Sequence, residues 1–252
     1  MAASKYLDVI IAGFGGQGVL LIGNLLAYAG MKQNMCVTYI PVYGVEMRGG
    51  TANCTVVLSS DEIGSPIITR PKSLIVMNRP SLDKFQPKLL DGGIQLVNAS
   101  LVDEKLVDKS GRIRTVMIPA NELADKVGNA RAVNTIMLGA YVQATGVMPL
   151  TAVEDCLASV MAAKIVPVNV TALRAGAEYA AGQMAGAKPA AKPAAKKPAA
   201  KPATKAAAAK KPAAKPASAK KAAAKKAAAK PVKPAKPAAK KPAKPAKPAK
   251  KK

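Results

Sequence analysis

A glycine-rich segment near the start of the chain has the clearest potential for chemistry. It reads GFGGQG from Gly13 to Gly18, which fits the spacing G-x-G-x-x-G, and it stands between a β-branched apolar run and an apolar stretch with helical spacing. Backbone N–H groups at such a turn, with the dipole of the following helix, favour an anionic group such as pyrophosphate. The alternative is a tight turn whose glycines only let the helix approach the sheet. The candidate cofactor-binding residues are Gly13, Gly15, Gly16, Gln17 and Gly18.

A dinucleotide-binding function needs a further residue, an acid near the end of the second strand that binds the ribose hydroxyls. The second apolar run ends Thr38-Tyr39-Ile40-Pro41 and contains no acid there. An independent NAD-binding reductase is therefore disfavoured. It remains as an alternative that predicts cofactor binding by the isolated chain.

A second segment combines charged side chains with glycines. Glu46 and Arg48 stand two residues apart and are followed by Gly49 and Gly50. Paired glycines permit close backbone approach, so this loop suits contact with another protein surface or with an anion. The alternative is an exposed ion pair before a hairpin turn. The interface or pocket candidates are Glu46, Arg48, Gly49, Gly50, Thr51 and Asn53.

Three further polar residues are weaker candidates. Asn78, Arg79 and Ser81 follow the apolar run SLIVM, at the carboxyl end of a predicted strand. Ligands gather at that edge in open α/β sheets. Asn134 begins an apolar helical pattern, and we expect it to start a helix or contact a partner rather than to take part in catalysis.

Composition excludes several kinds of catalytic site. The 252 residues include no His, so a Ser-His-Asp triad, an imidazole base and a His-ligated metal cannot be built from this chain alone. Cys36, Cys54 and Cys156 are widely spaced and too few for a four-thiolate iron–sulfur cluster. We expect buried thiols in a reducing cytoplasm, and no metal site in this chain.

The uncharged stretch Val9–Met31 is long enough to span a bilayer. Its six glycines, with Gln17 and Asn24 among them, instead divide it into a short strand, a loop and a helix. No small-residue cleavage site follows a suitable apolar segment. Neither a membrane contact nor a secretory signal is therefore expected.

The positive charge is concentrated at one end of the sequence. Residues 187–252 hold 23 of the 39 Lys and Arg residues together with 12 Pro, and they contain no acidic, aromatic or Gly residue. Residues 1–186 carry 16 basic and 14 acidic side chains. We therefore expect one domain at 1–186 and a disordered Lys/Ala/Pro-rich basic tail at 187–252. The tail would act either as a solubilising tether or as a nonspecific contact for polyanions such as nucleic acid.

Short apolar runs alternate with helical patterns over the first part of the domain. We expect strands at 6–12, 36–40, 51–59, 73–78, 94–98 and 112–118, with Pro41 ending the second. We expect helices from Gln17 to Gly30, at 81–90 and at 119–126. This alternation predicts an α/β fold with a Rossmann-like, mostly parallel sheet and flanking helices.

The last part of the domain is expected to be helical. Apolar stripes predict one helix from Val133 and another from Leu150, whose start shows the capping-box spacing of Thr151 and Glu154. Asn169 is expected to cap a final helix that ends near Gln183.

Three ordered motifs resemble a known family. GFGGQG from Gly13, YGVEMRGGTANCTVV from Tyr43 and IGSPIITRPKSLIVMNRPSLDKF from Ile63 closely resemble the gamma subunit of 2-oxoacid:ferredoxin oxidoreductases. The resemblance covers roughly residues 5–183 and is strongest to the 2-oxoglutarate type. The form EMRGGT at 46–51 resembles the 2-oxoglutarate and branched-chain members, whereas pyruvate enzymes usually have a different version of this loop. The tail lies outside it.

The resemblance implies a multisubunit enzyme that oxidatively decarboxylates 2-oxoglutarate, transfers the acyl group to coenzyme A and reduces ferredoxin. It implies that this chain is not catalytic alone. Thiamine diphosphate, magnesium and iron–sulfur clusters would lie in alpha and beta partner subunits, or in a delta subunit where one is present. The glycine loop would contact coenzyme A, and the Glu46–Gly50 loop would face the catalytic subunits.

Other functions fit parts of the same sequence. Branched-chain (2-oxoisovalerate) and pyruvate oxidoreductases have gamma subunits of the same kind. A nucleic-acid-associated protein that acts through its basic tail belongs to a different class. Copurification would distinguish the two classes, because the enzyme predicts thiamine- and cluster-bearing partners and its rival predicts nucleic acid alone.

Overall fold

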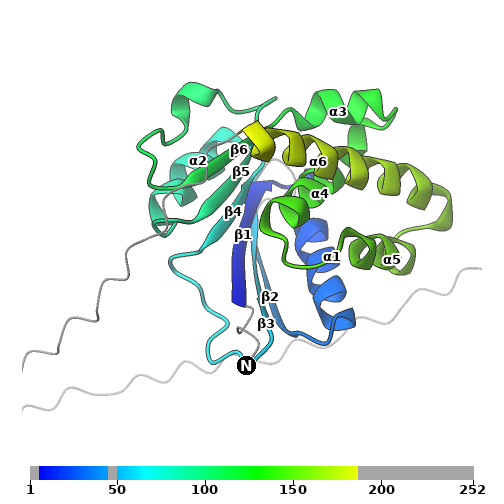
Figure 1. Ribbon diagram of the computed structural model, residues 1–252, viewed down its shortest axis with the longest axis horizontal. Helices are drawn as coiled ribbons and strands as arrows, with labels where there is room; N and C mark the ends of the chain where they lie inside the picture. The colour runs from blue at the N-terminus through cyan, green and yellow to red at the C-terminus, as the bar shows by residue number, and fades with distance from the viewer. Residues whose placement is uncertain (1–5, 45–49, 187–252) are drawn as a thin grey trace, which may run out of the picture. The chain divides into compact units, whose positions relative to one another are not determined.

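Six β-strands form the central sheet of the domain (Figure 1). The computed structural model describes residues 6–44 and 50–186. The strand order is β2-β3-β1-β4-β5-β6. The strands are β1 (Tyr6–Phe14), β2 (Cys36–Tyr43), β3 (Thr51–Ser59), β4 (Ser73–Val76), β5 (Ile94–Asn98) and β6 (Arg114–Ile118).

Helices cover both faces of this sheet, which confirms the predicted α/β class and its helical C-terminal part (Figure 1). Val9 and Ile11 share a core with α1, α4, α5 and α6, whereas Ile10 packs with α2 on the opposite face. Successive residues of β1 thus point to opposite faces, so the strand is apolar throughout. The helices are α1 (Val19–Lys32), α2 (Arg79–Phe85), α3 (Ala120–Lys126), α4 (Val133–Thr145), α5 (Leu150–Val160) and α6 (Val166–Gly186), and the 3-10 turns are η1 (Gln86–Lys88), η2 (Glu104–Leu106), η3 (Ala130–Ala132) and η4 (Ala163–Ile165).

The sheet is mostly parallel, as predicted, but one antiparallel strand interrupts it. β1, β4, β5 and β6 run parallel to one another. β3 is antiparallel both to β1 and to β2, so it lies between the two strands that α1 connects. The neighbour of β1 on that side is therefore not the next strand in sequence. In the usual dinucleotide-binding fold, the strand that follows the first helix lies next to β1 and ends in an acid that binds the ribose. Here β3 takes that place beside β1.

Two expected boundaries are wrong for reasons of packing. Pro41 lies inside β2, paired with Cys54, because β2 is the edge of the sheet and an edge strand tolerates a missing N–H donor. Gly30 does not end α1, which continues to Lys32. A Cβ at Gly30 would lie 2.5 Å from Leu58 Cδ2, so the glycine allows the helix to pack closely on β3.

Two expected helix caps are also wrong. α5 begins at Leu150 after Pro149 without a side-chain cap, and Glu154 forms an ion pair of 2.7 Å with Arg174 on α6. α6 begins at Val166, so Asn169 lies within its first turn rather than ahead of it. Asn169 Nδ2 donates to the carbonyl oxygen of Ile165 at 2.8 Å, and Asn169 Oδ1 accepts from Thr135 Oγ1 at 2.8 Å. Its side chain thus joins α6 to α4.

No helix in the described ranges 6–44 and 50–186 has the length and apolar character needed to cross a membrane. The uncharged stretch that could have been a span is divided between β1, the glycine loop and α1, as predicted. The expected tail at 187–252 lies outside the described residues.

α4 and α6 cross in backbone contact at two glycines. A Cβ added to Gly139 would lie 1.9 Å from the carbonyl oxygen of Leu173, and one added to Gly176 would lie 2.0 Å from that of Ile136. Main-chain atoms cannot move aside as a flexible side chain can. Glycine at these two positions is therefore required by the helix crossing.

We expect Gly139→Ala to lower the free energy of unfolding by about 1–3 kcal/mol, because the added methyl group forces the two helices apart. Gly182→Ala is the matched control, since Gly182 is also a helical glycine, on α6, but a Cβ added there would meet no neighbouring segment within 4 Å. There the same change should raise the free energy of unfolding by about 0.5–1 kcal/mol. Urea unfolding measures both, and equal effects of the two changes would contradict the crossing argument.

Candidate functional site

The glycine loop adopts the strand–loop–helix geometry predicted for it. Gly16 and Gly18 have φ angles of 100° and 73°, which favour glycine, and Gly18 is the N-cap residue of α1. A Cβ at Gly18 would lie 2.5 Å from Asn134 Nδ2, and one at Gly13 would lie 2.8 Å from Met77 Cβ. The loop therefore runs in contact with the start of α4 and the end of β4.

Gln17 holds this loop in place through its side-chain amide. Gln17 Oε1 accepts a hydrogen bond from the backbone N–H of Phe14 at 2.7 Å and another from Asn78 Nδ2 at 3.2 Å. Gln17 Nε2 lies 3.4 Å from the carbonyl oxygen of Met77, to which it donates. Gln17 thus lines the site while its amide links the loop to the carboxyl end of β4.

The weaker candidates have structural partners of their own. Asn78 Oδ1 accepts from the backbone N–H of Ser81 at 3.0 Å, so Asn78 caps α2. The side chains of Asn78 and Ser81 are buried. Arg79 is exposed and forms a 3.8 Å ion pair with Asp83. These residues position the loop or lie at the surface, and none of them lines the cavity described next.

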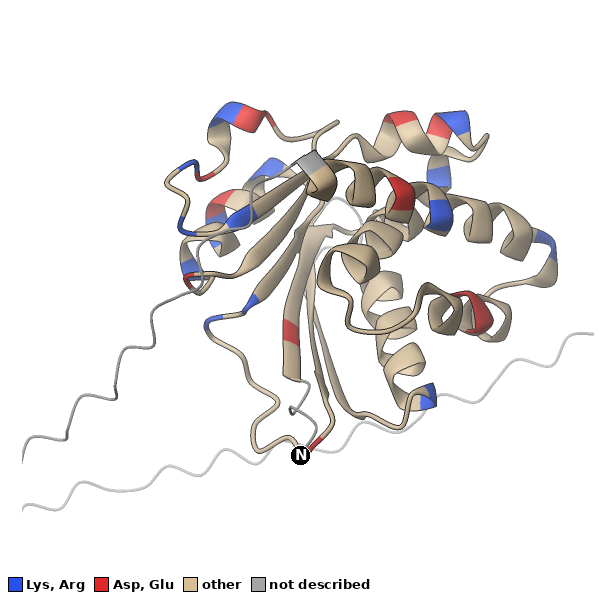
Figure 2. Ribbon diagram, in the orientation of Figure 1, with Lys and Arg blue, Asp and Glu red and all other residues tan. Residues whose placement is uncertain are grey.

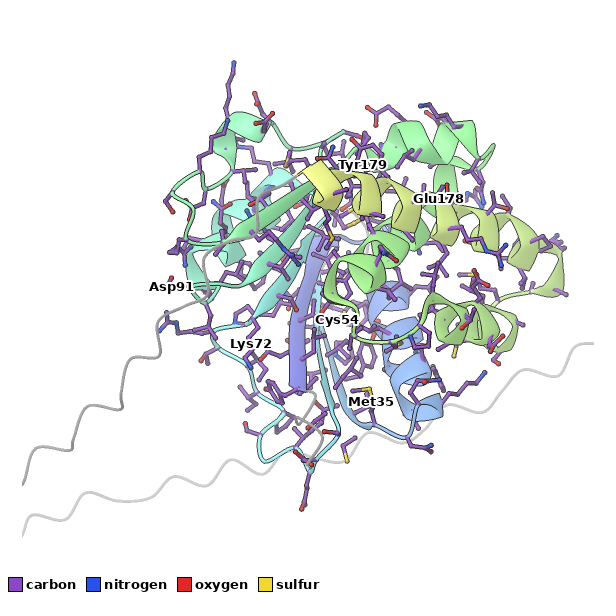
Figure 3. All side chains as sticks on the ribbon, in the orientation of Figure 1. Met35, Cys54, Lys72, Asp91, Glu178 and Tyr179 are labelled. Carbon is purple, nitrogen blue, oxygen red and sulfur yellow. The ribbon has the colours of Figure 1, made fainter. Side chains whose placement is uncertain are left out.

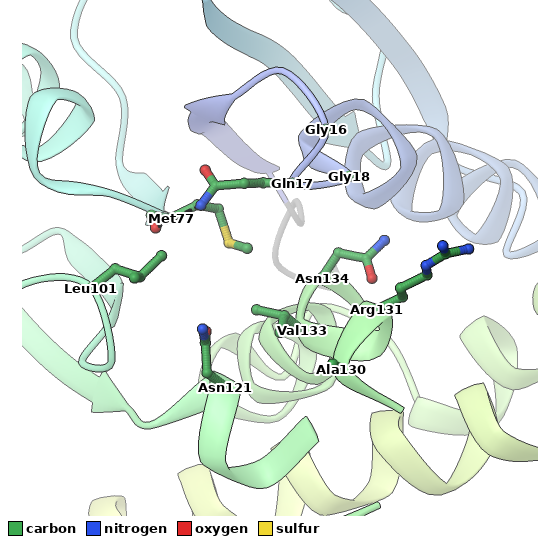
Figure 4. Close-up of a pocket in the computed structure, with 10 residues that line it drawn as sticks. All are labelled: Gly16, Gln17, Gly18, Met77, Leu101, Asn121, Ala130, Arg131, Val133 and Asn134. Atoms are coloured by element: carbon green, nitrogen blue, oxygen red, sulfur yellow. Dashed lines mark hydrogen bonds between the residues drawn. The ribbon is translucent and has the colours of Figure 1, made fainter. Parts of the chain in front are cut away.

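A cavity of about 430 Å³ opens beside the glycine loop (Figure 4). Its charged lining residue is Arg131, and no acidic residue lines it. Figure 4 shows the side chains of Arg131, Asn134 and Asn121 on one side of this space, opposite the loop. The lining residues are Gly16, Gln17, Gly18, Met77, Leu101, Asn121, Ala130, Arg131, Val133 and Asn134.

Three helices begin at this cavity. Gly18 precedes α1, Asn121 is in the first turn of α3, and Val133 opens α4. The N-terminus of a helix carries partial positive charge, and its first N–H groups have no hydrogen-bond acceptor within the helix. Together with the guanidinium of Arg131, these ends favour a phosphate or carboxylate group in the cavity.

Hydrogen bonds with Asn98, the last residue of β5, and with Ser100, just after β5, fix the position of Asn121. Asn98 Nδ2 donates to Asn121 Oδ1 at 3.1 Å, and the backbone N–H of Asn121 donates to Ser100 Oγ at 3.1 Å. Glu122 follows in sequence, but Ser100 Oγ donates a hydrogen bond to its carboxylate, which lowers the pKa of Glu122. The carboxylate of Glu122 is thus hydrogen-bonded to Ser100, and neither residue lines the cavity.

The second predicted segment meets the glycine loop at its end. The backbone N–H of Gly15 donates to the carbonyl oxygen of Gly50 at 2.9 Å, and Thr51 pairs with Phe14 in the sheet. Asn53, farther along β3, pairs with Ala12. The structure therefore brings Gly50, Thr51 and Asn53 to the strand that carries the loop. Glu46, Arg48 and Gly49 lie outside the described residues, so their predicted interface role stays a prediction.

The cysteines are not arranged for redox or metal chemistry. Cys54 lies on β3 beneath α1 (Figure 3), where burial raises its pKa to about 12 and its thiol donates to the carbonyl oxygen of Val19 at 3.6 Å. Burial also raises the pKa of Cys156. Cys36 is exposed, so the expectation of a buried thiol is wrong there, because β2 is an edge strand. Within the described residues, no group of three or more Cys, Asp or Glu side chains could hold a metal ion.

Sequence patterns did not identify Arg131 and Asn121 as site residues, and they assigned Asn134 to a helix start or an interface. Asn134 does lie in the first turn of α4, but its side chain contacts Gly18. The sequence signal that could have identified them is a group of polar residues at the start of an apolar helical pattern, namely Asn129, Arg131 and Asn134. The location of these residues beside the glycine loop depends on the order of the strands in the sheet, which a sequence pattern does not reveal.

The fold and the cavity define a Rossmann-like α/β domain with an anion-favouring site at the carboxyl edge of its sheet. The family model described as pyruvate ferredoxin/flavodoxin oxidoreductase matches residues 8–179. The chain belongs to this family, and its domain is of the gamma-subunit type.

Relatives differ in how much of their length this chain covers. It is 41% identical over 176 residues to the ketoisovalerate oxidoreductase subunit VorA of Methanothermobacter thermautotrophicus, a match that covers 68% of this chain but only 36% of VorA. It is 32% identical to the 2-oxoglutarate synthase subunit KorC of Methanothermobacter marburgensis, over 68% of this chain and 95% of KorC. The crystal structure of the keto/oxoacid ferredoxin oxidoreductase gamma subunit of Geobacter sulfurreducens has a TM-score of 0.61 and 28% identity, and the match covers 70% of this chain and 99% of that one.

Proposed function

We propose that this chain is the gamma subunit of a 2-oxoacid:ferredoxin oxidoreductase and completes the coenzyme A pocket of the assembled enzyme. The observation that supports this most directly is the family match over residues 8–179, together with 95% coverage of KorC. In such an enzyme a 2-oxoacid is decarboxylated, its acyl group passes to coenzyme A, and two electrons pass to ferredoxin. The subunit would act in the cytoplasm, where its partners and ferredoxin are expected.

Coenzyme A fits the donor set of the cavity because it carries phosphate groups. The backbone amides of Gly16 and Gly18 and the side chains of Arg131 and Asn134 would hold a phosphate-bearing part of it. Coenzyme A supplies the thiol that accepts the acyl group. The residues of this chain would bind and orient it, and the absence of a lining acid avoids repulsion of the phosphates.

The groups that break the carbon–carbon bond and carry electrons are proposed to belong to partners. This chain has no His, no G-D-G…N thiamine motif and only three widely spaced cysteines. Thiamine diphosphate with its magnesium ion and the iron–sulfur clusters would therefore be held by alpha and beta subunits, or by a delta subunit. This chain would contribute shape and hydrogen-bond donors.

Two 2-oxoacids, 2-oxoglutarate and 2-oxoisovalerate, are candidates for the substrate of the complex. The motif EMRGGT fits both 2-oxoglutarate and 2-oxoisovalerate enzymes, whereas the higher identity to VorA than to KorC favours 2-oxoisovalerate, so we propose the branched-chain substrate as the preferred one. Purification of the native complex tests both the assembly and the choice. We expect thiamine- and cluster-bearing subunits to copurify with this chain, and coenzyme A-dependent reduction of ferredoxin to be fastest with 2-oxoisovalerate. Faster turnover of 2-oxoglutarate would restore the sequence-based assignment, and turnover by the isolated chain would contradict the subunit role.

Gly16→Asp tests the phosphate role of the glycine loop. A carboxylate at the loop should repel the phosphates, so we expect the KM for coenzyme A to rise at least about tenfold in the complex, while the KM for the oxoacid stays the same. Gly111→Asp is a matched control, since Gly111 also has a positive φ, of 77°, and open space around it. Equal KM values for coenzyme A in the two variants would show that the loop only packs.

Contact with nucleic acid is a second candidate function, and it would be carried out by the tail at 187–252. The tail has 23 lysines and no acidic residue, which favours binding to a polyanion. Lysine–phosphate contacts release counterions, so six to ten of them would weaken binding by roughly 10³- to 10⁵-fold between 50 and 200 mM salt. We expect gel-shift assays with duplex DNA to show this dependence for the full chain and its loss when the chain ends at Gly186. Equal DNA retention by the shortened chain would contradict a role of the tail.

A further inference from the structure

The described residues of α1 and β2 form a surface that is almost free of charge. Among the described residues 6–44 and 50–59, only Asp8 and Lys32 are charged, whereas residues 60–186 contain 25 charged side chains. Asp8 is buried in β1, and Lys32 is the last residue of α1. Figure 2 shows α1 without charged residues along its length up to that end. The surface that α1 and β2 form therefore differs from the mixed-charge surface elsewhere.

This side also exposes large apolar residues. Of the nine exposed large hydrophobic side chains in the described chain, five lie in residues 6–44. On α1, the residues Leu20, Asn24, Tyr28 and Met31 follow one another at helical spacing on its outer side. Tyr28 and Met31 are 49% and 60% exposed. The inner side of α1 is buried against the sheet, so apart from Asn24 and the terminal Lys32 the helix is apolar on both sides, which is typical of a helix covered on both sides.

An apolar groove connects this surface with the functional site. Leu20, Leu21 and Tyr43 line a groove of about 250 Å³ whose wall also includes Gly16 and Gly18 of the glycine loop. The same two glycines line the cavity proposed for coenzyme A. Tyr43, at the end of β2, is 61% exposed. Together, Leu20, Leu21, Tyr28, Met31 and Tyr43 form the α1–β2 face.

We propose that the α1–β2 face is the surface on which the catalytic partner subunit docks, through an uncharged apolar patch of that subunit with one large side chain in the groove. This assignment rests on the proposed function. Interface cores are rich in tyrosine and methionine and poor in charge, as this face is. Nucleic acid is a poor occupant, because none of the five described residues that form the face is a cation that could pair with its phosphates.

The position of the groove distinguishes a catalytic partner from a second copy of this chain. An occupant of the groove touches Gly16 and Gly18, so it lies next to the coenzyme cavity. The reacting groups must come from outside, since this chain has no His and its buried thiols of Cys54 and Cys156 have raised pKa values. A second copy would bring none of these groups. A subunit that carries them must approach this end of the domain.

Charge introduced on the face provides the test. We expect Tyr28→Glu and Met31→Glu, each introduced into the full chain and coexpressed with the partner subunits, to reduce copurification of those subunits at least tenfold. An unpaired carboxylate would be buried in the interface. Because both positions are exposed, each isolated variant should keep the far-UV circular dichroism and melting temperature of the wild type. Ile165→Glu is the matched control, since Ile165 is apolar and 39% exposed but lies on η4, and it should assemble normally.

Three outcomes would overturn the assignment. The first is normal assembly of Tyr28→Glu and Met31→Glu. The second is an equal assembly defect in Ile165→Glu, which would show that any added charge interferes. The third is a dimer of the isolated chain that Tyr28→Glu dissociates while assembly with the partners is unaffected, which would assign the face to a second copy. Failure of the wild-type chain itself to copurify with any thiamine-bearing subunit would be a distinguishable result, because it removes the proposed function and this docking surface together.

Discussion

The close approach of the glycine loop to the start of α4 is the constraint on which the site depends. A side chain at position 18 would collide with Asn134, and a side chain at position 13 would collide with Met77, so both positions require glycine. This approach brings the beginnings of α1 and α4 and the carboxyl end of β4 to one cavity. Because helix N-termini carry partial positive charge, their convergence favours an anion where a single helix would offer a weaker site.

The polar side chains around this cavity mostly hold backbone in place. The amides of Gln17 and Asn78 connect the loop, the end of β4 and the first turn of α2. Asn98 holds the side-chain amide of Asn121 at the start of α3. The thiol of Cys54, beneath α1, has a pKa of about 12 and stays protonated near neutral pH. These contacts support the proposal that the domain binds and orients a charged molecule while its partners supply the proton and electron chemistry.

Charge divides the chain into three regions. The described residues of the first two strands, α1 and β3 carry two charges, the rest of the domain carries both signs in similar number, and the charged residues of 187–252 are all lysines. Moving apolar surface out of water lowers the free energy, whereas burying charged groups costs free energy because they lose their hydration. The exposed part of the first region therefore fits the proposed protein interface, whereas the second region fits contact with solvent. The glycine loop lies at the border between the uncharged face and the anion-favouring cavity.

The sequence by itself determined the strand–loop–helix unit at the N-terminus, the α/β class and the helical end, because glycine spacing and apolar periodicity are local properties. Only the tertiary structure decided that β3 separates β1 from β2 and that Asn169 joins α6 to α4 rather than capping a helix. It alone brought Arg131 to a loop more than 100 residues earlier in the chain. Such placements depend on sheet order and helix crossing, which are contacts between distant segments, and no period along the chain encodes them.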